Sequence, residues 1–482
     1  MRQSYGLFLA GRSFDGVRGV KFAYPLLRPI FGAALAALAM FAVSALPSAP
    51  AQAQGGPPVS LIRDTEVERV LRTYLDPILL AANLHPDAVH LYIVNDQSIN
   101  AFVAEGQNMF INTGLLMALD TPNEIAGVMA HETGHMADGH LVRTSQGIRA
   151  ASVPLILSMV IGVAAIAAGA GDAGSAILMG GQQIAQRTFL AFSRTQESSA
   201  DQAGIRYLNA THQSGLGMLR VFKRFENQEI LSSQRQDPFA QTHPASSDRI
   251  AALQGLVDAS LYRDVKDSPE SQFAFNMLRA KLRGYIERPD IALRRYPLSD
   301  NSKPARYARA MAYFHQPDMQ KALTEMEGLL KDEPENPYFL EMYGQIKVEM
   351  GKVDEGIVPY QAAVKILPDA PLLRVALGAA MLGTERTQYT EQAAKELQTA
   401  LEQERDNAFA WYELAQAYAR MGQTGRAELA TAERYFALDV FPQAIQFAGR
   451  SQKQLPPGST DWQRASDIIA IAQAQMAEQR NR

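Results

Sequence analysis

The spacing of apolar residues divides the chain into a mixed N-terminal part and a longer helical part. Between residues 61 and 84 apolar side chains recur at helical spacing, which predicts an amphipathic helix. Runs rich in β-branched and aromatic residues at 89–94, 101–103 and 109–111 predict three short strands. Gly106, between the last two runs, suits a hairpin turn. The sequence therefore predicts that a small sheet precedes the next helix.

The start of that next helix is clearly marked. Thr121 is a suitable N-cap, Pro122 takes the first helical position, and Glu124 falls three residues after the cap, which is the pattern of a capping box. The apolar period continues beyond His135. A second helical segment is predicted at 189–207.

From about residue 303 the sequence repeats with a period of 34 residues. Ala310, Gly344 and Gly378 stand at this spacing, and the pattern continues after a three-residue slip placed at 386–389. A period of 34 with small residues where helices touch resembles tetratricopeptide repeats. We predict an α-solenoid over 303–480, with three clear repeats and a further helical pair or cap after them.

The N-terminal residues have the pattern of an export signal. Basic residues precede an apolar run from Ile30 to Leu46, and Ala51-Gln52-Ala53 is a small-polar-small cleavage pattern. We expect residues 1–53 to be a cleaved signal peptide and 54–60 a linker, so that the mature chain is exported. An uncleaved membrane anchor is the alternative, because the run nearly reaches spanning length.

A second apolar run at 153–170 is rich in alanine and glycine. It is short for a membrane span and contains Pro154 and Gly162. A buried helix and a hairpin that contacts the membrane peripherally are both consistent with it.

Composition excludes some functions. The 482 residues are too many for one core and favour two or three domains. The formal net charge of -4 gives no basic surface for nucleic acid, so no nucleic-acid partner is expected. The chain has no cysteine, so a metal site must be built from histidine and carboxylates.

The segment 130–135 carries the candidate chemistry. His131 and His135 are four residues apart on the predicted helix, so both imidazoles lie on one face and can meet at one zinc ion. Glu132 lies between them, where its carboxylate can take a proton from water activated by the metal.

A catalytic zinc needs a third protein ligand and one open position. We favour Glu197 on the second helical segment, with Asp201 four residues later on the same face. A surface Glu/Asp pair is the alternative. His140 would point away from the pair on a continuing helix, so we expect it to support the site or lie at the surface.

His243 stands in a loop beside Pro244, before a helix start. Near a zinc ion, such a histidine could donate a hydrogen bond to the oxyanion of the reaction. It could instead occupy the open coordination position and switch the enzyme off. An ordinary loop histidine is the third alternative.

Together these motifs resemble the gluzincin metallopeptidases related to HtpX and the CAAX prenyl endopeptidases. The resemblance rests on the histidine pair, on Glu197-x-x-x-Asp201, and on Thr242-His243-Pro244 before Arg249. It covers 61–300 as an α+β protease domain with a small sheet, followed by the α-solenoid, in a mainly α chain.

The resemblance implies roles for these residues. His131, His135 and Glu197 would bind one Zn²⁺ per chain, and Glu132 would be the general base. Asp201 and Arg249 would support the ligands from behind, and His243 would cap the metal and restrain activity. Members with an export signal and repeats act in the periplasm in outer-membrane protein quality control, with proteolytic and chaperone-like roles.

Three functions remain open on the sequence alone. The first is a zinc endopeptidase for unfolded or misassembled proteins, with substrate added to the sheet edge and the repeats recruiting clients or the outer-membrane assembly machinery. The second is a chaperone or adaptor with a largely closed zinc site, although the intact Glu132 argues against a purely structural site. The third is an integral-membrane protease anchored by Ile30–Leu46 and 153–170. The sequence identifies no substrate-binding residues.

Overall fold

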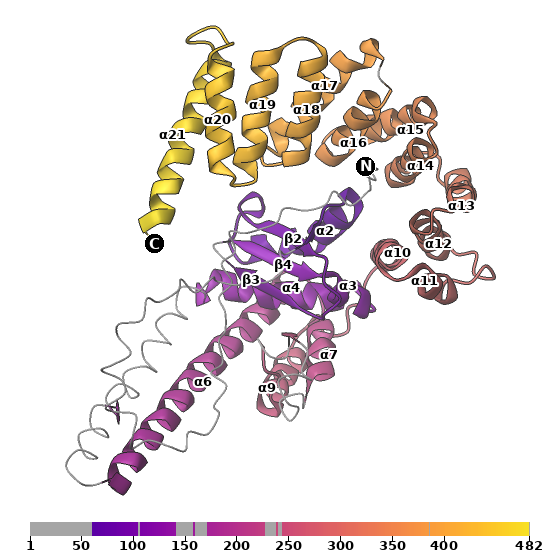
Figure 1. Cartoon of the computed structure of the whole chain (residues 1–482). Coiled ribbons are helices and arrows are strands. Elements are labelled where there is room, and N and C mark those ends of the chain that lie inside the picture. The colour runs from indigo at the N-terminus through magenta and orange to yellow at the C-terminus, as the bar shows by residue number, and fades with distance from the viewer. Residues whose placement is uncertain are drawn as a thin grey trace.

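Figure 1 shows the computed structural model, in which a mixed part with a small sheet lies inside the arc of a helical array. The structure describes residues 60–104, 107–140, 158–159, 171–226, 238–239, 243–384 and 386–481. The predicted signal peptide at 1–53, the linker up to residue 59, the hairpin residue Gly106 and nearly all of 153–170 lie outside these residues.

The sheet has four strands in the order β1-β2-β4-β3. Their bounds are β1 Leu61–Ile62, β2 His90–Val94, β3 Ala101–Ala104 and β4 Asn108–Asn112. β2 and β4 pair in parallel, whereas β3 and β4 form the predicted antiparallel pair, which leaves β3 at one edge. The expectation of a helix from residue 61 was wrong at its start: Leu61 and Ile62 pair with β2 instead.

Helix α2 (Thr65–Ala81) begins after this pairing ends. The Asp64 carboxylate caps it by accepting from the Val67 amide at 2.9 Å. Helix α3 (Thr113–Ala118) follows β4 directly and leads into α4 (Pro122–Ala137).

The start of α4 is as predicted, with one refinement. Thr121 Oγ1 accepts a hydrogen bond from the Glu124 amide at 3.3 Å, and Pro122 is the first helical residue. Glu124 Oε2 accepts in turn from the Asp120 amide at 2.7 Å, one residue before the expected donor. The helix ends at Ala137, two residues after His135.

The predicted segment 189–207 lies inside the longer helix α6 (Gly171–Ala210), which packs against α4. Among the described residues, four shorter helices with defined bounds follow α6 and lead toward the array. They are α7 Leu216–Phe225, α9 Ser247–Asp258, α10 Pro269–Ile286 and α11 Pro289–Arg295.

The helical array consists of five successive helix pairs. Their bounds are α12 Lys303–His315, α13 Met319–Asp332, α14 Pro337–Glu349, α15 Val353–Ile366, α16 Pro371–Leu382, α17 Thr387–Gln403, α18 Ala408–Arg420, α19 Thr424–Ala437, α20 Phe441–Gln452 and α21 Thr460–Asn481. A Cβ on Gly344 would meet Tyr360, and one on Gly378 would meet Leu397, which lies 37 residues after Tyr360. The three-residue slip is therefore an extra turn at the start of α17.

A buried charge cluster joins the mixed part to the array. Lys281 of α10 is fully buried, and its Nζ lies 2.7 Å from Asp64 Oδ2 and 3.1 Å from Glu66 Oε2. The Tyr307 hydroxyl of α12 donates to Glu66 at 2.8 Å, and Glu341 of α14 interacts electrostatically with the same ammonium. The two parts therefore share buried ionic contacts as well as apolar ones.

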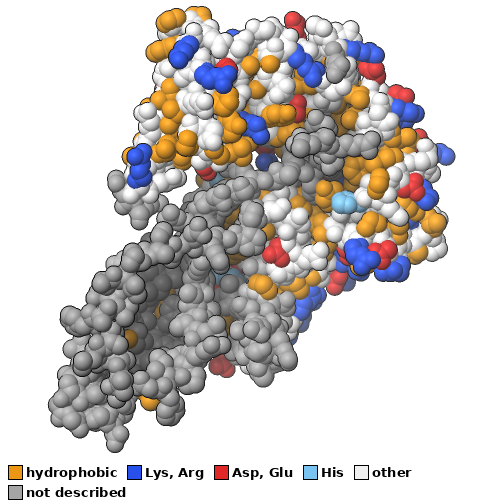
Figure 2. All heavy atoms as spheres, in the orientation of Figure 1, with side chains coloured by type: hydrophobic (Ala, Val, Ile, Leu, Met, Phe, Trp, Pro, Cys, Tyr) orange, Lys and Arg blue, Asp and Glu red, His pale blue; other side chains and the backbone are white. Residues whose placement is uncertain are grey.

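The fold class predicted from the sequence is confirmed: a mainly helical chain with one small sheet and a repeat array. Among the helices that the structure describes, none is both long and apolar enough to cross a membrane. On the face in Figure 2, acidic and basic side chains of the array are interspersed with apolar ones.

Candidate metal centre

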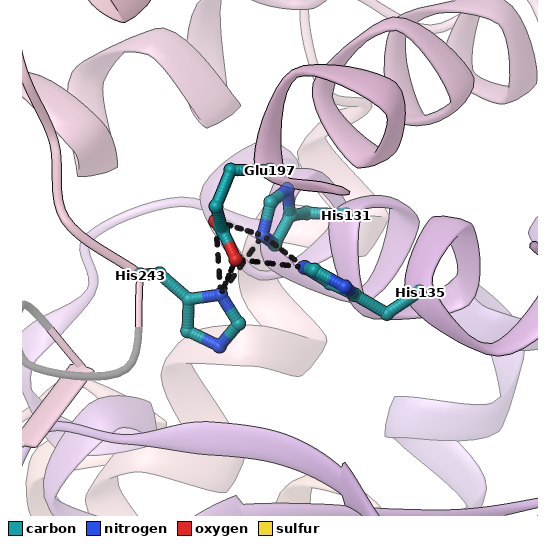
Figure 3. Close-up of side chains that lie close together, drawn as sticks. All are labelled: His131, His135, Glu197 and His243. Carbon is teal, nitrogen blue, oxygen red and sulfur yellow. Dashed lines mark hydrogen bonds and ion pairs between the residues drawn. The ribbon is translucent and has the colours of Figure 1, made fainter. Parts of the chain in front are cut away.

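Two helices bring the three predicted ligands together, as Figure 3 shows. His131 and His135 project from one face of α4, and their Nε2 atoms lie 3.1 Å apart. Glu197 reaches them from α6, with Oε1 3.3 Å from His135 Nε2 and Oε2 3.5 Å from His131 Nε2. All three side chains are buried.

His243 completes the group from the segment before α9. Its Nδ1 lies 3.2 Å from both Glu197 oxygens and 3.2 Å from His131 Nε2. One ligand atom from each of the four residues lies within 4.8 Å of the others. His243 is therefore not an ordinary loop histidine remote from the site. Thr242 lies outside the described residues.

Small residues allow α4 and α6 to approach closely enough for this convergence. A Cβ on Gly134 would lie 2.9 Å from the Ala200 carbonyl oxygen, and one on Gly204 would lie 3.2 Å from the His131 amide nitrogen. These contacts set the distance between the histidine pair and Glu197.

Asp201 and Arg249 lie behind the ligands. Asp201 Oδ1 is 3.1 Å from His131 Nδ1, the ring nitrogen that faces away from the cluster. Arg249 donates to both Asp201 oxygens, at 2.6 and 2.9 Å, and its Nη1 lies 2.8 Å from Glu197 Oε2. A carboxylate on the outer nitrogen fixes the tautomer and orientation of a ligating imidazole.

Glu132 is the predicted base, and its side chain is buried beside the cluster. Among the residues that the structure describes, none donates a hydrogen bond to either of its oxygens, and His243 Nε2 lies 3.4 Å from Oε1. Burial raises the pKa of Glu132 to about 7, although His131 and His135 oppose this. A buried carboxylate without hydrogen-bond donors is costly, so its retention here indicates a chemical role.

The charges of the cluster depend on one another. Burial lowers the pKa of His131, but its contacts with Asp201 and Glu197 outweigh burial and raise the pKa to about 9. Burial lowers the pKa of His135 and of His243. Burial alone would raise the pKa of Glu197, but the positive groups around it, His243 first, hold it well below the ordinary value.

The direction expected for the His140 side chain was wrong, although support of the site was one of the two positions expected for it. Because α4 ends at Ala137 and Gly139 takes a left-handed conformation (φ +63°), the chain turns back. His140 is buried, and its Nδ1 lies 3.0 Å from His135 Nδ1. His140 therefore contacts the ring nitrogen of His135 that faces away from the cluster. In the sequence, the glycine directly after the helix was the signal for this turn.

Two aromatic residues near the site were not singled out in the sequence. The ring of Phe222 meets His131 edge-on at 5.1 Å and supports the Arg249 guanidinium at 4.8 Å. Phe239 lies 4.9 Å from the His243 ring, and its carbonyl accepts from the His243 amide at 2.8 Å. Phe222 is one of several apolar residues of α7, and Phe239 stands in a mostly polar segment, so no pattern marked them.

The donor set suits a metal ion. Three imidazoles and one carboxylate are ligands that divalent transition metals such as zinc prefer, and all four are buried at one point. The buried Glu132, without hydrogen-bond donors of its own, is consistent with a neighbour of positive charge. The residues therefore fit a metal centre.

The chain is similar to known proteins in both parts. Residues 62–257 match the model of peptidase family M48, and residues 396–428 match a tetratricopeptide repeat. The chain is 26% identical over 415 residues to the beta-barrel assembly-enhancing protease of Escherichia coli K12, which covers 85% of this chain and 83% of that protein.

A second relative matches a smaller share of the chain. The mitochondrial metalloendopeptidase OMA1 of Schizosaccharomyces pombe is 27% identical over 202 residues, which cover 42% of this chain and 55% of that protein. Among solved structures, MamA aligns with a TM-score of 0.27 at 20% identity, over 36% of this chain and 97% of its own. The family resemblance found in the sequence is confirmed: the chain is a metallopeptidase with a family M48 domain at residues 62–257 and tetratricopeptide repeats toward its C-terminus.

Proposed function

We propose that this protein is a zinc-dependent endopeptidase of the bacterial periplasm that hydrolyses misfolded or stalled envelope proteins. The observation that carries the proposal is the convergence of His131, His135 and Glu197 beside Glu132, a buried carboxylate without hydrogen-bond donors. The four residues supply three ligands and a base.

When bound by these ligands, zinc would supply a Lewis acid for the scissile carbonyl and lower the pKa of water. Glu132 then takes the proton of the attacking water and delivers it to the leaving amide nitrogen. The contacts of Asp201 and Arg249 keep the His131 ring and the Glu197 carboxylate in place during this exchange.

The position of His243 supports a second candidate function, in which the protein acts mainly as a chaperone or adaptor with a latent protease site. The Nδ1 atom of His243 lies 3.2 Å from both Glu197 oxygens, where it would occupy the coordination position that substrate needs. In the protease, His243 must withdraw before a peptide can be cleaved. The two functions therefore differ in how often His243 leaves the coordination position that substrate needs.

The sheet offers a way to hold substrate. Among the described strands, β3 pairs with β4 alone. Helix α4, which carries the histidine pair, packs against β3. An extended peptide that adds to β3 gains main-chain hydrogen bonds that are indifferent to sequence. This suits unfolded or misassembled clients of varied sequence.

The cellular setting is inferred from the sequence and from a relative. Residues 1–53 have the pattern of an export signal, and the Escherichia coli relative is named for enhancing β-barrel assembly. We propose that the repeats recruit the outer-membrane assembly machinery or its clients, and that 153–170 provides peripheral membrane contact.

The test uses the mature chain, residues 54–482, with casein as an unfolded substrate and zinc content measured alongside. We expect one zinc per chain, cleavage by wild type or by His243→Ala, and no cleavage by Glu132→Gln. Glu335→Gln, an exposed residue of the array, is the matched control.

The outcomes separate the two functions. Faster cleavage by His243→Ala than by wild type makes this histidine the cap of a working protease. Zinc binding without cleavage by either chain, including His243→Ala, favours the chaperone or adaptor. Cleavage that persists in Glu132→Gln contradicts the proposed chemistry.

A further inference from the structure

The inference concerns the outer face of the metal centre, where His140 meets His135. The turn after α4 is built by Asp138 and Gly139, whose amides donate to the carbonyls of Gly134 and Met136 at 3.1 and 3.2 Å. A Cβ on Gly139 would meet nothing within 4 Å, so glycine serves there for its left-handed backbone and not for space. The turn folds His140 back onto the helix that it has just left.

The ring nitrogens then have defined roles. His135 Nε2 faces the cluster, 3.3 Å from Glu197 Oε1, so this nitrogen must be the unprotonated one when it binds a metal. The proton of the neutral ring then sits on Nδ1, and His140 Nδ1 is 3.0 Å away. That nitrogen of His140 is therefore the acceptor, and His140 carries its own proton on Nε2.

Other contacts of His140 fit this assignment. Its Nε2 faces Asp138 Oδ2 at 3.6 Å, and Ser199 Oγ donates to the same oxygen at 2.5 Å. The carbonyl of His140 accepts from Gln196 Nε2 at 3.2 Å, one residue before Glu197. Both the ring and the backbone of His140 are thus connected to α6, the helix that carries the third ligand.

We propose that His140 is a positioning residue that orients His135 for metal binding by accepting a hydrogen bond from its Nδ1–H. The two imidazole ligands then have different supports: a carboxylate, Asp201, for His131 and a neutral imidazole for His135. This inference rests on the metal site of the proposed function. A neutral acceptor fixes the ring of His135 without adding negative charge to the site.

Loss of the acceptor has a predictable effect on metal affinity. Without it, the Nδ1–H of His135 is buried without a partner, and the ring is no longer held at one angle. Loss of such a partner weakens metal binding by about 10- to 100-fold. Asparagine can place Oδ1 near the position of His140 Nδ1, so it keeps the acceptor, whereas leucine removes it.

The experiment compares His140→Leu and His140→Asn with wild type in the full mature chain. Zinc affinity is measured by competition with a chelator, and the absorption spectrum of the cobalt(II)-substituted protein reports ligand geometry. His85→Leu, at a side chain that is 80% exposed, is the matched control. Circular dichroism establishes that each variant is folded.

We expect His140→Leu to bind zinc about 10- to 100-fold more weakly with an altered cobalt spectrum, and His140→Asn to recover most of the affinity. Equal affinity and equal spectra for His140→Leu and His85→Leu would overturn the proposal. If His140→Leu does not fold, His140→Gln replaces it, because the longer side chain of glutamine places its amide beyond the position of His140 Nδ1. Equal zinc affinity of the asparagine and glutamine variants would then overturn the proposal. A wild-type chain without zinc affinity would instead refute the metal site itself.

Discussion

Arg249 lies against Glu197, the carboxylate that converges with the histidine pair, with Nη1 2.8 Å from Oε2. The same guanidinium holds Asp201 through two hydrogen bonds. A single buried cation therefore orients one ligand directly and a second ligand, His131, through Asp201. The site depends on the planar fork of arginine and not merely on its charge.

We expect Arg249→Lys to weaken zinc binding by about tenfold or more, because lysine cannot hold Asp201 and Glu197 at once. Zinc titration with a competing chelator measures the change. Arg220→Lys, in a half-exposed pair with Glu124, is the matched control and should leave the affinity unchanged. Equal affinities for the two variants would contradict the role of the fork.

The close approach of α4 and α6 makes a second prediction. Gly134→Ala would place a methyl group 2.9 Å from the Ala200 carbonyl oxygen, so the helices must separate and carry Glu197 away from the histidines. We expect a loss of about 1–3 kcal/mol in the free energy of unfolding and weaker zinc binding. Gly255→Ala in α9, where a Cβ meets nothing within 4 Å, is the control and should be neutral or stabilising. Thermal unfolding of both variants tests the difference.

The pKa of Glu132 predicts how cleavage depends on pH. Burial raises this pKa to about 7, and a base must be ionised, so kcat/KM should rise with pH up to about 7 and then level. A bound cation lowers the pKa of the carboxyl, so the midpoint should lie at or below 7. A profile that is flat between about pH 5 and 8 would contradict the assignment.

The measurement uses casein cleavage by the His243→Ala chain, with zinc content determined at each pH. That control is necessary because the His131 pKa of about 9 means that protons compete with the metal as the pH falls. A decline in activity at constant zinc content belongs to Glu132.

Sequence reasoning worked where one local rule decides the outcome. The spacing of His131 and His135 and the cap at Thr121 are properties of a single helix, so the sequence predicted both. Glu197 and Asp201 were placed on one face of a helix, and the structure directs the first into the cluster and the second to His131 Nδ1.

The features of the fold and the site that the sequence did not predict depend on contacts between distant segments. The reversal at Gly139 brings His140 onto His135, although a continuing helix would have separated them. Lys281 sits among the apolar residues of α10, and only the fold reveals that carboxylates from two other helices surround it. No periodicity within one segment contains that information.

The charge cluster around Lys281 predicts how stability depends on pH. Burial raises the pKa of Glu341 from 4.5 to about 8, and Lys281 only partly opposes this. Between these two values the folded state keeps a proton that the unfolded state has lost. This contribution to stability is fully present at low pH and is lost as the pH rises toward 8.

Glu341→Gln cannot ionise, so its unfolding free energy should fall less steeply than that of wild type between about pH 5 and 8. Urea unfolding at several pH values measures the two slopes. Glu335→Gln, at an exposed site on the same array, should keep the slope of wild type. Parallel slopes for wild type and Glu341→Gln would remove Glu341 as the source.

The same cluster restricts which repeat arrays can be joined to this peptidase domain. Lys281 pairs with Asp64 and Glu66 on one side of the junction and interacts electrostatically with Glu341 on the other. An array exchanged for one without matching polar groups at the junction would leave part of this cluster buried and unpaired, which destabilises the fold. A functional chimera must therefore import both sides of the junction.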